Sequence, residues 1–559
     1  MKCPVVFGIS DNDISISLKG QGYARSLLLP DNEMMASKKS STHVPVFHAD
    51  GNCMLDVYDQ TLQATDYARK HSAPAIVLYS NLTRRFGHAA TDRQSAYLTN
   101  GEIQTAADTD VILHNAIRAL ELGAMGSVRE VRDLFVSLQE IAERAFDTAV
   151  EEPKISARKE MIDRASPPPI PVSKLSDSLL RVPHDIRNPR QPPPSPSIQK
   201  TNTKPQVMRK LMTKVLSESL TRDPSLLYVG EDVRHGGYYL VTHGLADQFP
   251  SRVQDFPPDE TTLIGSALGY AQCGFTPIVE IPYAKYLDCG LDMFHEVAID
   301  HWLNSNNHNN HNNNNGTTTK TTTNGMVFRL QGFDKGKFGG NFHTHNMLHM
   351  PPGVDVVCYS NGEDYVRGMR NAILQASQGG RKVMLVDCTY LLNLKHLYQQ
   401  GDCAWERYYP EDTTEIMGFH DVRRYHGRKN AGGDRQKKVA IVSYGNGVVT
   451  SLRARKQLLD SSGGERQPID IDVIDCPYIS HVPNGLREII PNYDHVIFAD
   501  ICKEGSNPMS AMVARLQKMA CLPKSWQCVA APTTYNPLGN DTLTFLNEED
   551  IIEAYHVLI

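Results

Sequence analysis

Short apolar runs alternate with helically spaced stretches along most of this chain. Residues 3–9, 44–47 and 75–79 are three such runs, and residues 54–70 carry apolar side chains at helical spacing. A strand, a helix and a second strand in this order predict a parallel sheet, because parallel strands need a crossover connection. The predicted fold class is therefore α/β, with parallel sheets flanked by helices.

The same alternation returns in two later regions. The first begins with an amphipathic helical stretch and continues through predicted strands at residues 226–229, 276–281, 326–331, 354–358 and 382–387. The second, residues 437–559, reads as a compact α/β domain of alternating strands and helices. The chain is therefore expected to hold more than one parallel sheet.

Two proline clusters, residues 167–171 and 192–196, separate the first region from the second and predict an extended linker. A tract of Asn, His and Thr interrupts the second region. It lacks apolar side chains and predicts a disordered insertion rather than a metal-binding tract. The expected organisation is a first domain over 1–150, a linker over 151–206, a second domain over 207–400 with the insertion at 304–324, a connector over 401–436 and a third domain over 437–559.

Composition excludes several classes of protein. The 559 residues carry 57 Lys and Arg against 63 Asp and Glu, a net charge of −6, which gives no overall attraction to nucleic acid. No run of about 18 apolar residues is present, so no membrane span is predicted. The 11 cysteines form no C-x-x-C pair, which is typical of a reducing compartment and not of a disulfide framework. The N-terminal residues resemble neither a signal peptide nor an Arg-rich transit peptide.

An acidic residue, Glu260, stands directly before a predicted small-residue helix over residues 262–274. It can act chemically, or it can simply stabilise the helix N-terminus through the macrodipole. Gly445 and Gly447 lie between a predicted strand and helix, where they can hold an anion or make a tight turn. The full G-x-G-x-x-G pattern is absent, which favours the turn.

Two further segments have the residue types of a site. His343, His345 and His349 follow two glycines, so they can be metal ligands, acid–base groups or residues of a closing loop. Arg85 and His88 follow the predicted strand at 75–79, at the end where α/β sheets place their sites. Arg85 can pair with a phosphate, or the segment can be a surface charge cluster.

Taken in chain order, these motifs resemble the thiamine diphosphate-dependent decarboxylating component of 2-oxo acid dehydrogenase complexes, with the α and β subunits fused. Residues 10–17, 50–58 and 85–97 resemble the α-type pattern. The β-type pattern is matched by residues 230–233, 255–265, 277–280, 352–353 and 356–357, and residues 437–559 resemble the transketolase C-terminal domain. The resemblance implies a thiamine diphosphate-binding fold followed by a transketolase C-terminal-like α/β domain.

The resemblance also implies which residues hold the cofactor. Glu260 takes the place of the glutamate that activates thiamine diphosphate, and Glu231 lies in a second cofactor-binding motif. Arg85 would bind the diphosphate, Asn12 would give its side-chain oxygen to Mg²⁺, and Ile14 would give its backbone carbonyl. Oxygen ligands of this kind are the ones that Mg²⁺ prefers. The family's Gly-Asp-Gly metal motif would fall before residue 1, so the α-like part is expected to be N-terminally incomplete.

The histidines are assigned to proton transfer, because their ordinary pKa is near neutrality. His88 is one catalytic candidate, and His343 and His345 compete for a second role. The implied activity is oxidative decarboxylation of a 2-oxo acid. The sequences at residues 50–58 and 95–97 favour a branched-chain substrate over pyruvate. A catalytically incomplete or structural relative is the alternative.

The implied partners are a small 2-oxo acid and the lipoyl domain of a dihydrolipoyl acyltransferase, which accepts the acyl group. The family builds its sites between an α-type and a β-type domain, so a homo-oligomer of fused chains is expected. Neither nucleic acid nor a membrane is an expected partner. The resemblance implies the mitochondrial matrix as the location.

Overall fold

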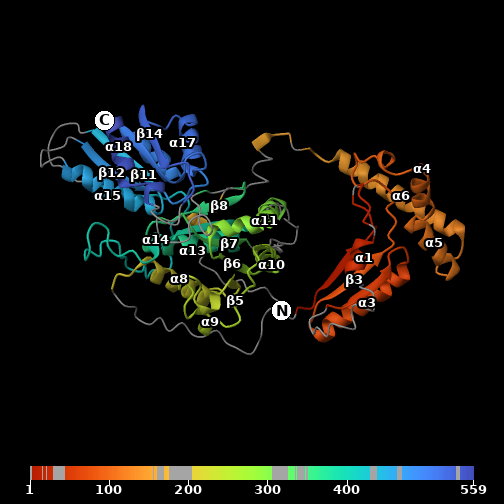
Figure 1. The fold of residues 1–559 in the computed structure, drawn as a ribbon. Helices are drawn as coiled ribbons and strands as arrows, with labels where there is room; N and C mark the ends of the chain where they lie inside the picture. The colour runs from red at the N-terminus through yellow and green to blue at the C-terminus, as the bar shows by residue number, and fades with distance from the viewer. Residues whose placement is uncertain are drawn as a thin grey trace. The chain divides into compact units, whose positions relative to one another are not determined.

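The structure is a computed structural model, and the fold is drawn in Figure 1. It describes residues 3–15, 17–20, 22–28, 44–154, 156–159, 169–175, 204–304, 325–333, 335, 347, 351–427, 437–461, 469–536 and 542–559. The chain divides into two compact units, Met1–Lys154 and Ile155–Ile559. Each unit is described by itself below.

The first unit contains a three-stranded parallel sheet in the order β1-β3-β2. Its strands are β1 (Val6–Ser10), β2 (Val46–Asp50) and β3 (Ala75–Ser80), and α3 (Met54–His71) connects β2 to β3. Short α1 (Tyr23–Leu28) follows β1. In the described part of the chain β1 is an edge strand and β3 is central.

Three helices follow, α4 (Asn100–Asp108), α5 (Val111–Glu121) and α6 (Val128–Glu151). Each begins at a residue whose side chain accepts a backbone N–H, a strong signal for a helix start. The helices keep many apolar side chains in water, among them Ile112, Leu113, Ile117, Leu134, Phe135, Leu138, Ile141 and Phe146. No described helix anywhere in the chain is both long and apolar enough to cross a membrane.

The second unit begins with a six-stranded, fully parallel sheet in the order β5-β4-β6-β7-β9-β8. Its strands are β4 (Leu226–Gly230), β5 (Val253–Asp255), β6 (Thr276–Ile281), β7 (Met326–Gly332), β8 (Val354–Val357) and β9 (Lys382–Cys388). The accompanying helices are α8 (Met208–Arg222), α9 (Leu245–Gln248), α10 (Glu260–Gln272), α11 (Leu291–Asn304), α13 (Gly362–Gly379) and α14 (Thr389–Leu392). The predicted α/β class with parallel sheets is confirmed. The 304–324 insertion lies outside the described residues beyond Asn304.

A five-stranded sheet in the order β10-β12-β11-β13-β14 completes the second unit. Its elements are β10 (Arg423–Tyr425), β11 (Lys437–Ser443), α15 (Asn446–Ser461), β12 (Ile469–Asp475), α16 (Asn484–Ile489), β13 (His495–Lys503), α17 (Pro508–Lys518), β14 (Ser525–Ala531) and α18 (Glu548–Leu558). Four strands are parallel, and β10 pairs antiparallel with β12. Strand β10 lies in the segment predicted as a connector, and three residues are too few for a hydrophobic pattern to reveal.

The Gly-rich turn between β11 and α15 is buried against the six-stranded sheet. Gly445 has φ +52°, and a Cβ there would lie 2.7 Å from Cys358 Sγ and 2.8 Å from Cys388 Sγ. Asn446 Nδ2 donates to Phe333 O at 2.7 Å. The turn therefore needs glycine for close packing, and the tight-turn interpretation explains these residues.

Part of the predicted linker packs on the second unit. Ile170 N donates to Gln375 Oε1 at 3.0 Å, and Gln375 Nε2 donates back to Ile170 O at 2.6 Å. Gln375 lies on α13 and is buried. One amide side chain thus holds both backbone groups of Ile170, as a neighbouring strand would.

Candidate active site

Neighbouring strands of the six-stranded sheet end at a shared edge that carries two carboxylates. Glu231 follows β4 directly, and Glu260 is the first residue of α10, which follows β5. The next strand, β6, leads into the 3₁₀ helix η4 (Ala284–Gly290), which carries Tyr286. Open α/β sheets bind ligands outside the carboxyl ends of their strands, so the location is that of a binding site.

Glu260 is not needed to cap its helix. Asp259 is the N-cap, and its carboxylate accepts from Thr262 N at 3.2 Å and from Thr262 Oγ1 at 2.7 Å. These hydrogen bonds hold the pKa of Asp259 below its ordinary value. Gly290 packs closely on Glu260, because a Cβ at Gly290 would lie 3.0 Å from Glu260 Cβ. The partly exposed Glu260 carboxylate is thus left to contact a ligand.

Three tyrosines form a chain of ring contacts that begins at Glu231. Tyr238 OH donates to Glu231 Oε1 at 2.9 Å, and its ring centroid lies 5.5 Å from that of Tyr283, which in turn lies 5.3 Å from that of Tyr286. Burial raises the pKa of Tyr238, and the bond to Glu231 raises it further. Burial also raises the pKa of Tyr286, with smaller contributions from Glu231 and Glu260.

A buried polar ladder lies beneath this cluster. Glu280 on β6 pairs with Arg329 on β7, with Oε2 2.6 Å from Nη1, and Arg329 Nε lies 2.6 Å from Asp387 Oδ2 on β9. Tyr228 OH on β4 donates a short hydrogen bond to Glu280. Burial raises the pKa of Asp387 to about 7, although Arg329 opposes the shift.

The ladder fixes the loop that carries the first carboxylate. A Cβ at Gly237 would lie 2.9 Å from Glu280 Oε1, and a Cβ at Gly230 would lie 2.8 Å from Glu280 O. Glycine is required at both ends of the segment that presents Glu231 and Tyr238, because the Glu280 residue fills the space below it.

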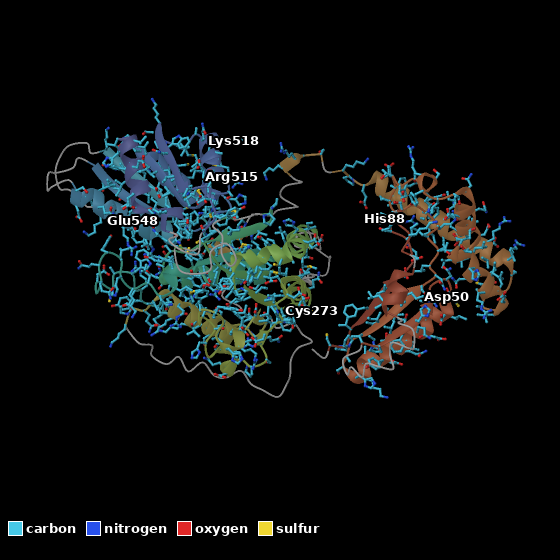
Figure 2. All side chains as sticks on the ribbon, viewed as in Figure 1. Asp50, His88, Cys273, Arg515, Lys518 and Glu548 are labelled. Atoms are coloured by element: carbon cyan, nitrogen blue, oxygen red, sulfur yellow. The ribbon has the colours of Figure 1, made fainter. Side chains whose placement is uncertain are left out.

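The first unit gathers a second set of polar groups at the carboxyl edge of its own sheet. Asn12 follows β1, and its Oδ1 accepts from Ile14 N at 3.1 Å. Arg85 and His88 follow β3. Arg85 Nε lies 3.6 Å from Asp110 Oδ2, and the Arg85 side chain is 38% exposed. The backbone N–H of His88 donates to Asp92 Oδ2 at 2.6 Å (Figure 2 labels His88).

Hydrogen bonds between loops hold this edge together. Arg84 Nη1 donates to Ser15 O at 2.5 Å, and its Nη2 donates to Tyr97 OH at 2.7 Å. Tyr97 OH donates to Asp92 Oδ2 at 2.6 Å, and this bond lowers the pKa of Asp92. The loops after β1 and β3 are therefore tied to each other through Arg84.

The structure brings together some of the predicted residues. Glu231 and Glu260 both lie at the carboxyl edge of the six-stranded sheet in the second unit, and Asn12, Ile14, Arg85 and His88 lie on two tied loops in the first. His343 and His345 lie outside the described residues. Within the described ranges, no group of three or more His, Cys, Asp or Glu side chains could hold a metal ion.

Sequence reasoning missed the aromatic part of the site. Tyr283 and Tyr286 stand just after a buried strand, at the end where sites form, so a search for aromatics at strand ends would have found them. Tyr238 carries no such signal, because it joins the cluster only through the fold of the loop after β4. The supporting residues Arg84 and Tyr97 were likewise hidden in a segment that reads as a charge cluster.

Comparisons with known proteins agree with the division of the chain into these two units. Residues 1–158 match the family model of the dehydrogenase E1 component, and residues 204–385 match that of the transketolase pyrimidine-binding domain. The pyruvate dehydrogenase E1 component subunit beta of Staphylococcus epidermidis is 26% identical over 60% of this chain and 94% of its own length. The acetoin:2,6-dichlorophenolindophenol oxidoreductase subunit beta of Cupriavidus necator is also 26% identical, over 59% of this chain and 89% of its own.

Among solved structures, a split-gene transketolase described as an inactive β4 tetramer aligns with 64% of this chain and 98% of its own, at 15% identity and a TM-score of 0.43. The second unit has the α/β architecture of parallel sheets flanked by helices that the pyrimidine-binding match implies. The chain thus joins, in one polypeptide, a segment similar to a dehydrogenase E1 component and a segment similar to the transketolase pyrimidine-binding domain.

Proposed function

We propose that this chain is a thiamine diphosphate-dependent enzyme that decarboxylates a 2-oxo acid, with α-type and β-type parts in one polypeptide. The observation that carries the proposal is that Glu231 directly follows β4 and Glu260 begins the helix after β5, at the carboxyl edge of the six-stranded sheet. The two family matches and the beta-subunit relatives support it.

The residues of the second unit fit the aminopyrimidine ring of that cofactor. A flat ring can pack on an aromatic face, and the rings of Tyr238, Tyr283 and Tyr286 form a chain of contacts that begins at Glu231. When bound, thiamine diphosphate supplies an electron sink that allows a 2-oxo acid to lose carbon dioxide. Glu260 would hold a proton between its carboxylate and a ring nitrogen, which is the step that activates the cofactor. Glu231, already bonded to Tyr238, would orient the ring.

The first unit offers groups for a diphosphate and its cation. Arg85 has one ion pair at 3.6 Å to Asp110, a separation that leaves the guanidinium able to contact a phosphate. Asn12 Oδ1 accepts one hydrogen bond and retains a second lone pair for Mg²⁺. His88 uses its backbone N–H in the loop, so its ring is the part proposed to move a proton.

The finer parts of the proposal concern substrate and partners. A branched-chain 2-oxo acid is the proposed substrate, pyruvate is the competing one, and a lipoyl domain is the proposed acyl acceptor. A homo-oligomer and the mitochondrial matrix remain predictions of the same resemblance. The relatives named above are bacterial proteins, named for pyruvate and acetoin.

The test is decarboxylation by the full chain, supplied with thiamine diphosphate, Mg²⁺ and an artificial electron acceptor. Replacing Glu260 by Gln should preserve folding and lower kcat by about 100-fold or more, because proton transfer by a positioned group contributes that much. Glu488→Gln on α16 is the matched control, an exposed glutamate far along the chain, and should leave kcat unchanged.

Near-wild-type turnover in the Glu260→Gln enzyme would overturn the site assignment. Absence of decarboxylation in the unmodified chain would favour a catalytically incomplete relative. Comparing kcat/KM for 3-methyl-2-oxobutanoate and pyruvate then tests the substrate. A preference for pyruvate would overturn the branched-chain proposal and leave the reaction type standing.

A further inference from the structure

An open hollow lies in the second unit and is lined by other residues than those of the candidate active site. It measures about 390 Å³ and is lined by Tyr390 of α14, the segment of residues 393–400 and Arg453 of α15. Cavities that bind small molecules are commonly of about 300–1,000 Å³. None of the residues that the site assignment uses lines it.

The wall of this hollow is fixed by hydrogen bonds. The carboxylate of Asp402 accepts from the backbone N–H groups of Leu397 at 3.0 Å, Tyr398 at 2.7 Å and Gln399 at 3.0 Å. The backbone N–H of Ala404, which donates to Asp402 Oδ1 at 3.0 Å, and these three bonds lower the pKa of Asp402. Arg453 Nε donates to Leu397 O at 2.7 Å. The segment is therefore shaped before any ligand arrives, which reduces the entropy that binding must overcome.

The lining carries positive charge and no acidic side chain. Among the described residues, the Lys395 ammonium has neither an ion pair nor a hydrogen-bond acceptor, and the side chain is exposed. Arg453 uses Nε for the wall and Nη1 for Tyr390 OH at 2.9 Å, and Glu548 Oε1 lies 3.9 Å from Nη1. The Nη2 group has no partner in the described part of the chain.

Histidine and amide donors add to these cations. His396 Nδ1 accepts from Cys403 N at 3.1 Å, so the neutral ring carries its proton on Nε2 and can donate from there. Asp402 Oδ1 lies 3.7 Å from the same Nδ1 and is the nearest acidic group to this ring. Gln399 and Gln400 present exposed amides to the hollow.

The rest of the lining is apolar or aromatic. Leu394 and Leu397 form part of the surface, and the rings of Tyr390 and Tyr398 stand among the polar groups. Aromatic faces of this kind favour a flat ring. A charged patch beside tyrosines and leucines therefore suits a molecule with an anionic end and a flat body.

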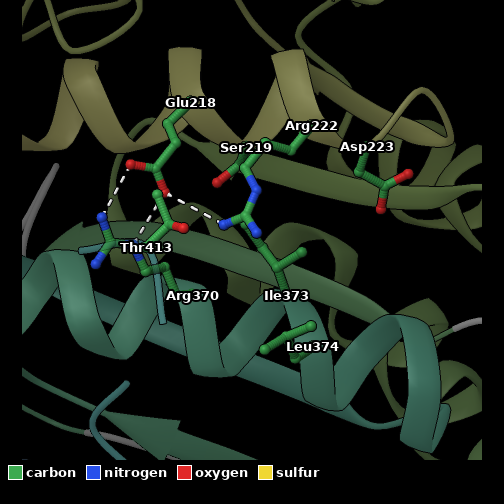
Figure 3. Close-up of a pocket in the computed structure, with 8 residues that line it drawn as sticks. All are labelled: Glu218, Ser219, Arg222, Asp223, Arg370, Ile373, Leu374 and Thr413. Carbon is green, nitrogen blue, oxygen red and sulfur yellow. Dashed lines mark hydrogen bonds and ion pairs between the residues drawn. The ribbon is translucent and has the colours of Figure 1, made fainter. Parts of the chain in front are cut away.

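A smaller hollow in the same unit offers a contrast. Between α8 and α13, Glu218 pairs with Arg370 through two bonds of 2.9 Å, and the remaining space is only about 20 Å³ (Figure 3). That volume holds about one water molecule. The Glu218 and Arg370 charges in that lining pair directly, whereas the lining of the larger hollow contains no acidic side chain and its acidic neighbours, Glu548 and Asp402, lie 3.7–3.9 Å from Arg453 and His396.

We propose that the larger hollow binds a small organic phosphate whose body is a flat ring, of about the size of a nucleoside monophosphate. Lys395 and the Nη2 group of Arg453 contact the phosphate, with His396 Nε2 as a further donor. The ring lies against Tyr390 or Tyr398. This proposal does not depend on the proposed reaction, because the two sites share no residue.

The experiment is calorimetric titration of the full chain with adenosine 5′-monophosphate, adenosine and inorganic phosphate at low ionic strength. The monophosphate should bind at least about tenfold more tightly than either fragment, since one hydrogen bond to a charged group is worth that much. Lys395→Met should weaken this binding by about tenfold. Gln400→Glu, an exposed change that adds a negative charge, should weaken it as well.

Lys518→Met is the matched control, because Lys518 is an exposed lysine of α17 outside the lining (Figure 2). It should leave the affinity unchanged. Equal binding of adenosine and its monophosphate would overturn the role of the cations, and equal binding of inorganic phosphate would overturn the role of the ring. Binding that survives both Lys395→Met and Gln400→Glu would place the ligand elsewhere and overturn the proposal.

Discussion

Each unit places polar side chains at the carboxyl edge of its own parallel sheet, but the two units support those side chains differently. In the second unit every residue of β4, β6, β7 and β9 is buried. In the first, the hydrophobic cluster of fully buried residues consists of Ala64, Ala75 and Val77. The edge strands β1 and β2 are exposed or half-exposed along most of their length, whereas the central strand β3 is buried at four of its six residues.

This difference shows that the position of a site in an α/β sheet is independent of how rigidly it is held. Glu231 stands on a loop fixed from below by Glu280, inside the core. Arg85 and His88 stand on loops fixed by hydrogen bonds among half-exposed groups, for which water competes. Local unfolding is therefore expected to cost much less free energy in the first unit than in the second.

Breaking the buried ladder should have the largest effect on this comparison. Arg329→Met leaves Glu280 and Asp387 without their cation and should lower the free energy of unfolding of the second unit by about 3–5 kcal/mol. Urea unfolding followed by tryptophan fluorescence measures it, because all three tryptophans, Trp302, Trp405 and Trp526, lie in that unit.

The counterpart in the first unit is Arg85→Met. Its pair with Asp110 is partly exposed, so the change should cost at most about 1 kcal/mol, measured by hydrogen exchange of peptides from the first unit. Equal costs for the two arginines would contradict the difference in support.

The next largest difference between the units is expected in the unfolding free energy lost when one glycine is replaced by alanine. Gly445→Ala forces a side chain into φ +52° and against two buried sulfurs, and should cost about 2–4 kcal/mol by the same fluorescence measurement. Gly51→Ala in the first unit also makes a close contact, 2.5 Å from Leu82 Cγ, but that side chain is partly exposed and can move. Its cost should be about 1 kcal/mol or less. A larger cost at Gly51 would show that the first unit is as tightly packed as the second.

The pH dependence of stability should differ between the units as well. Burial raises the pKa of Asp387 from 3.8 to about 7, so between those values the folded second unit binds more protons than the unfolded chain. The contribution of Asp387 to the stability of this unit should therefore fall as pH rises through this window and level off above it. Asp387→Asn should remove this contribution, which urea midpoints from pH 5 to pH 8 would show. An unchanged slope in the variant would mean that another group titrates.

The smallest effect is expected on the exposed face of α6. Leu138 is 56% exposed, so Leu138→Ala should change the free energy of unfolding by less than about 0.5 kcal/mol. Leu211→Ala on α8, where the side chain is fully buried, should cost about 2–5 kcal/mol and is the matched contrast. A cost above about 1 kcal/mol at Leu138 would show that something covers this face in solution.

Hydrophobic periodicity predicted most of the strands and the parallel arrangement, because both depend on local patterns. The strand predicted at residues 276–281 has the observed bounds, and the helix predicted over 262–274 is observed two residues earlier, at Glu260–Gln272. Strand β10 was missed because it is short and pairs with β12, a contact between distant residues that no local pattern records.

The site was predictable only in part, for a related reason. Glu260 and Glu231 stand next to strand ends and helix starts, which sequence patterns mark. Tyr238 contacts Glu231 because the chain turns at Gly236 and Gly237, which both have positive φ. No local sequence pattern predicts such a contact. The exposure of the α6 face was hidden too, because an amphipathic pattern shows which side is apolar but not what covers it.

The two hydrogen bonds between Ile170 and Gln375 shorten the stretch of chain that follows the first unit before an anchored residue. Measured along the chain, 16 residues separate Lys154 from Ile170, whereas 50 separate it from Lys204. A fully extended chain covers about 3.5 Å per residue, so the anchor shortens the maximal reach from about 175 Å to about 55 Å. The two hydrogen bonds therefore limit the length of chain between Lys154 and the first residue anchored on α13. A single glutamine on α13 thereby sets the upper bound on that connection.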